Sequence, residues 1–399
     1  MLEEMIAPLN VDVIILPAIK IVDGNKGMVP IPMVAGKVIA VQGQLKAKKP
    51  QMLEFMQKAK PGLVLCFWHI TFAFMLKICM RPPPQMKVVH IAAQFALKRT
   101  LTLADLKMPL EVVTMATMDV MASIFEATGR CYAISPTSSD NALPPILELP
   151  PPLKPGLKPL ILCYFLVVKD ALKLERLLAK HRTGEDKYSF GGRTMSVEFH
   201  CFTANVLPTP KNRPLSLHSH PKQRQLFQDL FARCTGVIVS SGNETVWESV
   251  CRGVPVLTMP TTGHGEQLLN ARIHARNFPS NVRKTEVSGC IEPGGKLTLD
   301  DVLWVVNSGT QTPTAESAQL RARVGDLEQQ AIARELPMLR PPDEGAALPA
   351  PILLPPPTEA QLPAGRPATA LVAAGMFGAG MLTMWVIMGP AGLLGAAIL

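Results

Sequence analysis

The feature that most constrains the fold is a regular alternation of short apolar runs and helical patterns over residues 227–278. Strand, loop and helix are expected twice in succession, at Gly236–Ser240, Ser240–Asn243, Glu244–Arg252, Val254–Met259, Pro260–Gly265 and Glu266–Asn277. Gly253, with Pro255 beyond it, is a typical helix stop. Strands separated by helices pair in parallel, so the pattern predicts an α/β sheet whose loops meet at the ligand-binding carboxyl edge.

The same alternation continues upstream and predicts two Rossmann-like domains. The expected strands are 11–16, 63–67, 87–91 and 160–167, and the expected helices are 52–60, 70–80 and 171–181. A length of 399 residues with 48% hydrophobic residues is sufficient for two cores. A proline cluster that begins at Pro150 marks the boundary, so residues 1–149 form the first predicted domain and 150–308 the second.

The C-terminal end of the chain predicts a membrane anchor. Residues 309–367 read as a Pro/Ala-rich linker, since 337–367 contain ten prolines. Residues 368–399 carry no charge, and the 19 residues of 370–388 would span about 28 Å as a helix, close to the thickness of a bilayer core. We therefore expect a transmembrane helix within 368–399; the alternative is a buried core helix.

Two further expectations follow from that anchor. Arg366 precedes the apolar segment and no N-terminal signal peptide is visible, which favours a single-pass protein with its body in the cytosol. Small residues at Ala370, Ala374 and Gly378 would let a second helix approach closely. The pattern is compatible with a helix-mediated dimer or a membrane subunit as partner.

The net charge indicates which ligands the chain favours, and the cysteine pattern indicates its redox compartment. The net charge of +9 is unevenly placed: residues 309–399 hold five Arg against seven Asp and Glu, a net −2, so residues 1–308 carry +11. A basic body favours anionic ligands such as nucleotides. Nucleic-acid binding is not predicted, because the sequence contains no run of Lys and Arg with interleaved aromatic residues. The eight cysteines occur singly without a C-x-x-C pair, which excludes a zinc ribbon and favours a reducing compartment.

The turn before the helix at 244–252 has the chemistry of an anion site. Gly242 lets a phosphate approach the backbone, and the free N–H groups of the following helix suit a diphosphate. Thr245 adds a hydroxyl, and Glu248 lies one turn deeper on the same face, where a carboxylate could hold both hydroxyls of a ribose. The alternative for Glu248 is an ordinary solvated helix residue. Glu244 would repel a phosphate if it turned inward.

The residues of Cys234–Arg276 resemble the donor-binding motif of GT-B glycosyltransferases, most of all family 28 and its relatives, which include bacterial lipid-linked N-acetylglucosaminyltransferases. That motif places G-x-x-T-x-x-E after a strand, G-x-P at the next strand, then a proline and an E/Q-Q…N-A element. The matching positions are Gly242, Thr245, Glu248, Gly253, Pro255, Pro260, Glu266, Gln267, Asn270 and Ala271. Weaker similarity covers 160–166, 198–202 and 61–95.

The resemblance implies roles for seven residues. Gly242, Asn243 and Thr245 would face the diphosphate of a nucleotide sugar, and Glu248 would hold its ribose. The second loop would add Glu266 and Gln267, which reach the sugar or the diphosphate, and His264 as a neighbour of the donor. The resemblance also implies an inverting transfer with no metal and no tightly bound cofactor, the nucleotide sugar acting as co-substrate; no D-x-D metal motif occurs.

The family pattern fails at the N-terminus, where the Gly/His-rich loop that helps bind the acceptor has no counterpart. We therefore expect a truncated first domain without the usual base. His69, just after the strand at 63–67, is a candidate general base, although packing beside Trp68 is the plainer interpretation. His90 is a second candidate at a strand end. His218 and His220 are expected in a Pro-flanked loop, not at a metal site.

Taken together, these patterns predict a membrane-tethered GT-B glycosyltransferase that transfers a hexose-type sugar from a nucleotide sugar, presumed by resemblance to be a UDP-sugar, to an acceptor associated with a membrane. One alternative is a catalytically inactive nucleotide-sugar-binding or scaffold protein at a membrane. A third is a sugar-nucleotide epimerase on the same fold, for which the sequence lacks a second set of carboxylates.

Overall fold

A computed structural model describes the chain in two compact units, Met1–Leu327 and Glu328–Leu399. The described residues are 22–23, 27–28, 31–59, 63–67, 70–80, 86–102, 105–136, 142–143, 145, 147, 158–289, 293–308, 314–315, 317–318, 320–322, 371–377, 381–387 and 395–398. The strand expected at 11–16 lies outside them, and the domain boundaries assigned from the sequence stay predictions.

The larger sheet of the first unit has six strands, all parallel, in the order β12-β11-β7-β13-β14-β15. Its strands are β7 (Leu160–Tyr164), β11 (Glu198–Thr203), β12 (His218–Pro221), β13 (Gly236–Val239), β14 (Val256–Thr258) and β15 (Val282–Lys284). From β7 the chain builds outward through β11 and β12, and from β13 outward through β14 and β15. This order is that of a doubly wound sheet, with its switch point between β7 and β13.

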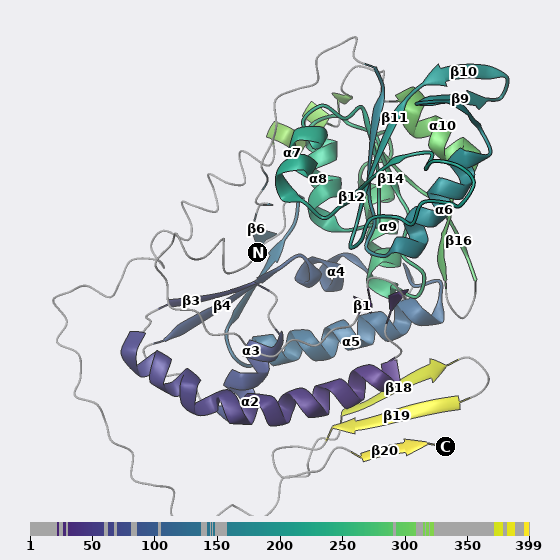
Figure 1. The fold of residues 1–399 in the computed structure, drawn as a ribbon. Helices are drawn as coiled ribbons and strands as arrows, with labels where there is room; N and C mark the ends of the chain where they lie inside the picture. Colours follow the sequence, from purple (N-terminus) through teal and green to yellow (C-terminus); the bar gives the residue numbers. More distant parts are fainter. Residues whose placement is uncertain are drawn as a thin grey trace, which may run out of the picture. The chain divides into compact units, whose positions relative to one another are not determined.

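Successive side chains of the strands are apolar and point to opposite faces of the sheet, so helices cover both faces. Ile161, Cys163 and Ile238 belong to one buried cluster, which includes residues of α6 (Val168–Ala179) and α10 (Leu299–Ser308). Leu162 and Val237, on the opposite face, pack with α7 (Arg224–Phe231) and α8 (Asn243–Cys251). Figure 1 shows these two pairs of helices on opposite sides of the sheet. Because both faces are covered, the strands are nearly continuous apolar runs.

The helices of this region begin and end close to their predicted positions. Helix α8 stops at Cys251, and Gly253 follows with a φ of 75°, a conformation that favours glycine. Helix α9 (Gly265–Asn277) starts one residue before its predicted bound. Thr298 and Asp301 cap the start of α10, because the Thr298 hydroxyl and the Asp301 carboxylate each accept a hydrogen bond from the other residue's backbone N–H.

Short antiparallel pieces complete the second half of the first unit. They are β8 (Arg182–Gly184), β9 (Lys187–Phe190) and β10 (Arg193–Ser196) in one sheet, and β16 (Glu286–Ser288) and β17 (Gly294–Lys296) in another. Gly191 and Gly192 both have positive φ and form the β9–β10 turn.

The first half of this unit holds a second parallel sheet, ordered β3-β4-β5-β6. Its strands are β3 (Leu63–Phe67), β4 (Lys87–Ala92), β5 (Arg130–Ile134) and β6 (Ala142–Leu143); its helices are α2 (Ile31–Ala59), α3 (Ile70–Phe74), α4 (Gln94–Thr100) and α5 (Pro109–Glu126). The strands predicted at 63–67 and 87–91 are confirmed. The helix predicted at 70–80 changes at Met75 to a π-helix, η2 (Met75–Cys79). A two-residue antiparallel pair, β1 (Val22–Asp23) and β2 (Gly27–Met28), precedes α2.

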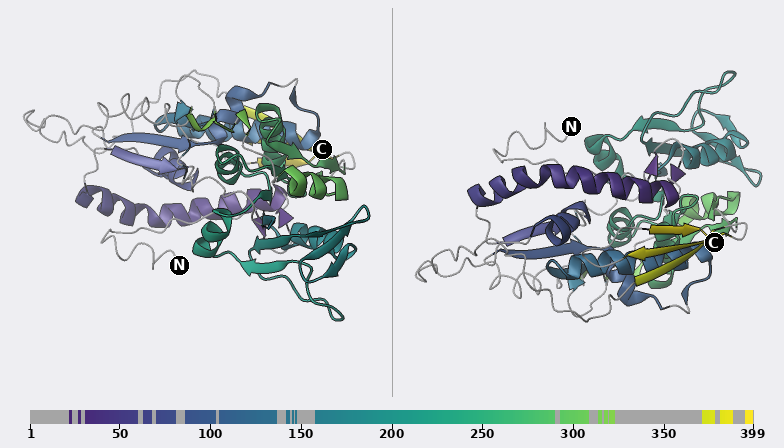
Figure 2. Two further views of the ribbon diagram at one scale, coloured as in Figure 1. Left: turned by 90° about the horizontal axis from the view of Figure 1, so that it is seen from above. Right: turned by 90° about the horizontal axis from the view of Figure 1, so that it is seen from below.

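Two clusters hold this first half together. Val41, Leu45 and Met52 of α2 pack with η2 and with the start of β4, so α2 lies along one side of the sheet (Figures 1 and 2). Phe95 of α4 meets Phe125 of α5 edge-on at 5.6 Å, in a cluster that reaches β3, β4 and β5. The two parallel sheets confirm the predicted α/β class.

The transmembrane helix expected within 368–399 is not confirmed. In the second unit, β18 (Leu371–Phe377), β19 (Met381–Ile387) and β20 (Gly395–Ile398) form an antiparallel sheet. Hydropathy alone does not distinguish an apolar helix from apolar strands, and each of Gly375, Gly378 and Gly380 costs a helix about 1 kcal/mol relative to alanine. Within the described part of the chain, no helix has both the length and the hydropathy needed to span a bilayer.

Candidate functional site

The candidate site lies where β7, β13 and β14 end at the carboxyl edge of the larger sheet. Helix α6 follows β7, helix α8 follows β13, and a loop to α9 follows β14. Since the switch point of the sheet falls between β7 and β13, this edge is where open α/β sheets bind ligands. The predicted site residues of 242–248 and 264–267 therefore come from neighbouring connections.

The N-terminus of α8 is open toward solvent. Gly242 is its N-cap residue, is exposed, and has an extended backbone with φ −75° and ψ 159°. Because glycine carries no side chain, no capping oxygen occupies the N–H groups of the first helical turn, and these remain available to an anion. The Gly242 N–H itself donates to Ser240 O, so the donors left for a ligand are those of residues 243–245.

The other predicted residues of α8 are accessible. Asn243, Thr245 and Glu248 are each partly exposed. The Thr245 carbonyl accepts a hydrogen bond from Ser249 Oγ at 2.6 Å, which uses the backbone and leaves the Thr245 side chain for other contacts. Glu248 is one turn further into the helix than Thr245. The structure thus brings Gly242, Asn243, Thr245 and Glu248 together at one helix end.

Gln267, which the sequence predicted to contact the ligand, instead bonds to the loop after β14. Gln267 is buried, and its Oε1 accepts the Thr261 N–H at 2.8 Å. The His264 N–H donates to Thr261 O at 3.0 Å, and Gly263 between them has a φ of 77°. Gln267 therefore shapes this loop, a role that the motif did not indicate.

His264 and Glu266 lie at the start of α9 and are both partly buried. Burial lowers the pKa of His264 to about 4, so its imidazole is neutral at pH 7. Burial raises the pKa of Glu266, while hydrogen bonds from the Gln94 and Asn270 side chains lower it. The Gln94 amide nitrogen lies 3.0 Å from Glu266 Oε1. A neutral imidazole and a hydrogen-bonded carboxylate suit recognition of hydroxyl groups.

Two residues at this edge were missed from the sequence. Ser240 Oγ accepts the Leu166 N–H at 3.0 Å and lies 3.3 Å from Thr261 Oγ1, so it joins the connections after β7, β13 and β14. Lys173, one turn into α6, donates to Asp170 at 2.8 Å and to Thr262 Oγ1 at 3.3 Å. The sequence signal for Ser240 is its position directly after β13, whereas Lys173 lies within α6 and carries no comparable signal.

The structure describes only one of the two candidates for the general base. His69 lies outside the described residues. His90 is fully buried, its Nε2 is 2.9 Å from Thr128 Oγ1, and its ring meets Phe125 edge-on at 4.8 Å. Burial lowers its pKa to about 4. His90 is therefore a packing residue of the first half, and a role as general base finds no support in its contacts.

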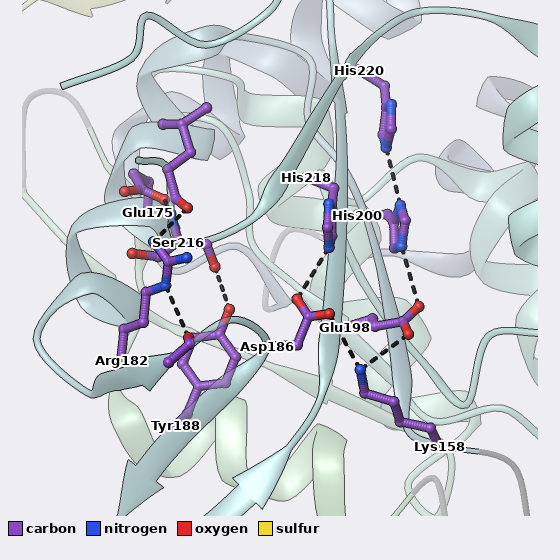
Figure 3. Close-up of polar contacts among 12 residues, drawn as sticks. Lys158, Glu175, Arg182, Asp186, Tyr188, Glu198, His200, Ser216, His218 and His220 are labelled. Carbon is purple, nitrogen blue, oxygen red and sulfur yellow. Dashed lines mark hydrogen bonds and ion pairs between the residues drawn. The ribbon is translucent and has the colours of Figure 1, made fainter. Parts of the chain in front are cut away.

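His218 and His220 do not lie in a loop, and that expectation was wrong. They form strand β12, which pairs with β11 and sets His200 beside both, as Figure 3 shows. His200 Nδ1 lies 3.0 Å from His220 Nε2, and the His200 and His218 rings stack at 4.6 Å. Over the described residues, no group of three His, Cys, Asp or Glu side chains is arranged to hold a metal ion.

Charged neighbours surround this histidine stack. Lys158 Nζ bridges Asp186 at 3.2 Å and Glu198 at 3.1 Å, and Asp186 also contacts His218 at 3.1 Å (Figure 3). Burial and then the neighbouring His218 and His220 lower the pKa of His200 to about 4. The group is a structural junction of β11 and β12.

The chain is similar, at low identity, to several solved structures. No family model matches the chain, and no curated protein matches it. Spinosyn forosaminyltransferase SpnP shares 13% identity and a TM-score of 0.45, over 73% of this chain and 79% of that chain. The glycosyltransferase SnogD from Streptomyces nogalater shares 15% and 0.42, over 79% and 86%. MurG from Acinetobacter baumannii shares 12% and 0.44, over 85% and 88%.

These neighbours are GT-B glycosyltransferases, the class that residues 234–276 resemble. At such identities and TM-scores nothing about the activity of this chain follows from the likeness.

Proposed function

We propose that this chain is a glycosyltransferase that takes a hexose-type sugar from a nucleotide-sugar donor, a UDP-sugar in the first instance, and transfers it to a membrane-associated acceptor. The observation that carries the proposal is the uncapped N-terminus of α8 at the switch point of a parallel sheet, with Gly242 exposed and Glu248 one turn beyond Thr245. The order of residues in the donor-binding motif agrees with it.

In this proposal the backbone performs the main electrostatic task. The N–H groups of the first turn of α8 and the positive end of its dipole face the diphosphate, and they stabilise the charge that builds up as it leaves. The acceptor oxygen forms a bond to the anomeric carbon while the bond from that carbon to the diphosphate breaks, which inverts the centre. The acceptor's proton passes to a base, for which His69 stays the candidate. No metal and no bound cofactor take part in this scheme.

In this proposal two carboxylates bind different parts of the nucleotide sugar. Glu248 accepts the two ribose hydroxyls, and Glu266 accepts hydroxyls of the sugar, its remaining acceptor positions being those not used by Gln94 and Asn270. His264, neutral because of its burial, contributes a hydrogen bond without adding charge. The apolar segment of 368–399 attaches the protein to a membrane and leaves the body in the cytosol.

Calorimetric titration of the full-length protein with UDP, ADP, GDP and TDP tests the proposal. UDP binding to the wild type, reduced about tenfold or more in Glu248→Ala with an unchanged melting temperature, is the expected result. Glu244→Ala is the comparison: Glu244 is an exposed carboxylate in the first turn of the same helix, and removal of its negative charge near the diphosphate should leave UDP binding unchanged or strengthen it. Absence of binding by all four nucleotides would end the proposal.

The alternative of a catalytically inactive nucleotide-sugar-binding protein has one observation in its favour. His90, the one described base candidate, is fully buried against Phe125, and burial lowers its pKa to about 4, which makes it a weak base. Donor hydrolysis or transfer to a panel of lipid-linked sugars separates the two functions. An inactive binder would show nucleotide binding without release of free UDP.

A further inference from the structure

We propose that Gln94 is a positioning residue that holds the Glu266 carboxylate in place for the donor sugar. This inference rests on the proposed function, and it assigns a part in donor recognition to the first half of the chain. The carrying observation is the hydrogen bond from Gln94 Nε2 to Glu266 Oε1 at 3.0 Å, between residues 172 positions apart.

Both residues lie where a ligand-binding edge would place them. Gln94 is the first residue of α4, directly after β4, an inner strand of the smaller parallel sheet. Glu266 is the second residue of α9, after the loop that follows β14. The carboxyl edge of each sheet therefore contributes one partner, and both side chains are partly buried.

Helix α9 approaches the first half closely at Gly265, which packs against the Thr114 side chain. A Cβ atom built on Gly265 would overlap Thr114 Oγ1 of α5 and would lie 3.1 Å from Leu110 O. Only a residue without a side chain allows this contact. Glu266 follows Gly265 directly, so its position relative to α5 is set by the same contact.

A buried ion pair fixes the other part of α9. The Arg272 guanidinium donates to the Glu111 carboxylate and to Asp105 O. Glu111 is 1% exposed and also accepts the N–H groups of Lys107 at 2.7 Å and Met108 at 3.1 Å. With Gly265 and Arg272 both held, the Gln94–Glu266 bond joins two elements that are already docked. It is not a chance meeting of mobile side chains.

The bond has a chemical consequence for Glu266. A carboxylate has about four acceptor positions, and the Gln94 and Asn270 amides use part of them while leaving the others for hydroxyl donors. Amide donors also favour the ionised form against the effect of burial. Without Gln94 the carboxylate would be less well oriented and would take up a proton at higher pH.

The experiment compares the affinity of UDP with that of two UDP-sugars, UDP-glucose and UDP-N-acetylglucosamine, in the full-length protein. The variant is Gln94→Met, which keeps the side-chain length and removes the donor; Gln94→Ala is the second variant in case the first does not fold. We expect UDP to bind both as it binds the wild type. The ratio of UDP-sugar affinity to UDP affinity should fall about tenfold. The pH at which half of this extra affinity is lost should be higher in the variants than in the wild type.

Gln225→Met is the matched control. Gln225 Nε2 donates to Asp229 Oδ1 at 2.9 Å, an amide–carboxylate bond of the same kind on the exposed face of α7. Its loss should change neither UDP nor UDP-sugar binding.

The outcomes separate this inference from the function beneath it. If the wild type binds no nucleotide, the proposed function fails. If the wild type binds UDP but neither Gln94 variant changes the contribution of the sugar or its pH dependence, the function stands and the role of Gln94 is refuted. The same holds if the two UDP-sugars bind the wild type no more tightly than UDP.

Discussion

Ser240 Oγ accepts the backbone N–H of Leu166 at 3.0 Å while the Ser240 N–H donates to Tyr164 O at 3.0 Å, and both bonds join the ends of β7 and β13 at the switch point of the larger sheet. Ser240 also lies 3.3 Å from Thr261 Oγ1, so the connections after three adjacent strands meet at one hydroxyl. The geometry of the candidate site depends on this junction because α8 starts only three residues later.

Ser240→Ala should therefore weaken both the fold and the site. The Leu166 N–H loses its partner in a partly buried place, which costs about 1–3 kcal/mol of unfolding free energy. Urea denaturation measures this loss, and UDP titration should show weaker binding at the same time. Ser249→Ala, which removes the bond to Thr245 O on the same helix, should leave UDP binding nearly unchanged. Equal effects of the two substitutions on binding would contradict the role given to Ser240.

Arg272→Ala should destabilise the first unit strongly, because it leaves the Glu111 carboxylate buried without its cation. Since Arg272 is 23% exposed and Glu111 retains two backbone donors, we expect a loss of about 2–3 kcal/mol rather than the larger cost of a fully buried pair. Chemical denaturation at pH 7 is the measurement.

Arg276→Ala provides the comparison for that experiment. Arg276 lies one turn further along α9 and pairs with Asp105 at 3.6 Å, with both side chains at least 32% exposed. Solvent screens such a pair, so the denaturation midpoint should not move. A midpoint that shifts as much for Arg276→Ala as for Arg272→Ala would show that burial of Glu111 is not the cause.

His274 should make the protein sensitive to acid. It is 2% exposed, neither ring nitrogen has a hydrogen-bond partner among the described residues, and its ring meets Trp247 edge-on at 6.2 Å. Burial lowers its pKa to about 3, whereas the unfolded chain binds the proton near pH 6.5. Stability is therefore lost as pH falls from about 7 toward 3, by about 2 kcal/mol between pH 7 and pH 5.

His274→Leu removes that proton uptake from the unfolded state and keeps an apolar side chain of similar size in the core. Urea midpoints measured from pH 7.5 to pH 5 should fall less steeply in the variant than in the wild type. Parallel curves for the two proteins would mean that other groups cause the acid sensitivity.

The local structure around the candidate site could be predicted from the sequence because its signals are local. Gly253 and Pro255 end α8, and apolar runs with period two or complete burial define β13 and β14. The order of these elements then places Gly242 and Glu266 at the same edge of the sheet.

The contacts that shape the site could not be predicted in the same way. Gln94 and Glu266 are 172 positions apart, and no periodicity fixes the distance between them. The stacking of His200 on His218 depends on the register between β11 and β12, which a Pro-flanked segment did not indicate. Gln267 matched a ligand-binding motif, yet its side chain closes the loop at Thr261. Within 368–399, hydropathy led to the prediction of a helix, because an apolar run does not by itself distinguish a helix from the strands β18 and β19.

The central claim is that the open first turn of α8 binds a diphosphate, and substitution of Gly242 tests it most directly. The backbone at Gly242 has a negative φ, and a Cβ there would meet only Ser240 O at 3.6 Å, so Ala, Asn and Asp all fit. Asp and Asn would cap the first-turn N–H groups, and Asp would add a negative charge.

UDP titration of the wild type and the three variants is the measurement. The account predicts that Gly242→Ala binds UDP almost as the wild type does, that Gly242→Asn binds it more weakly, and that Gly242→Asp loses about tenfold or more while its melting temperature stays the same or rises slightly. Undiminished UDP binding by Gly242→Asp would contradict the account.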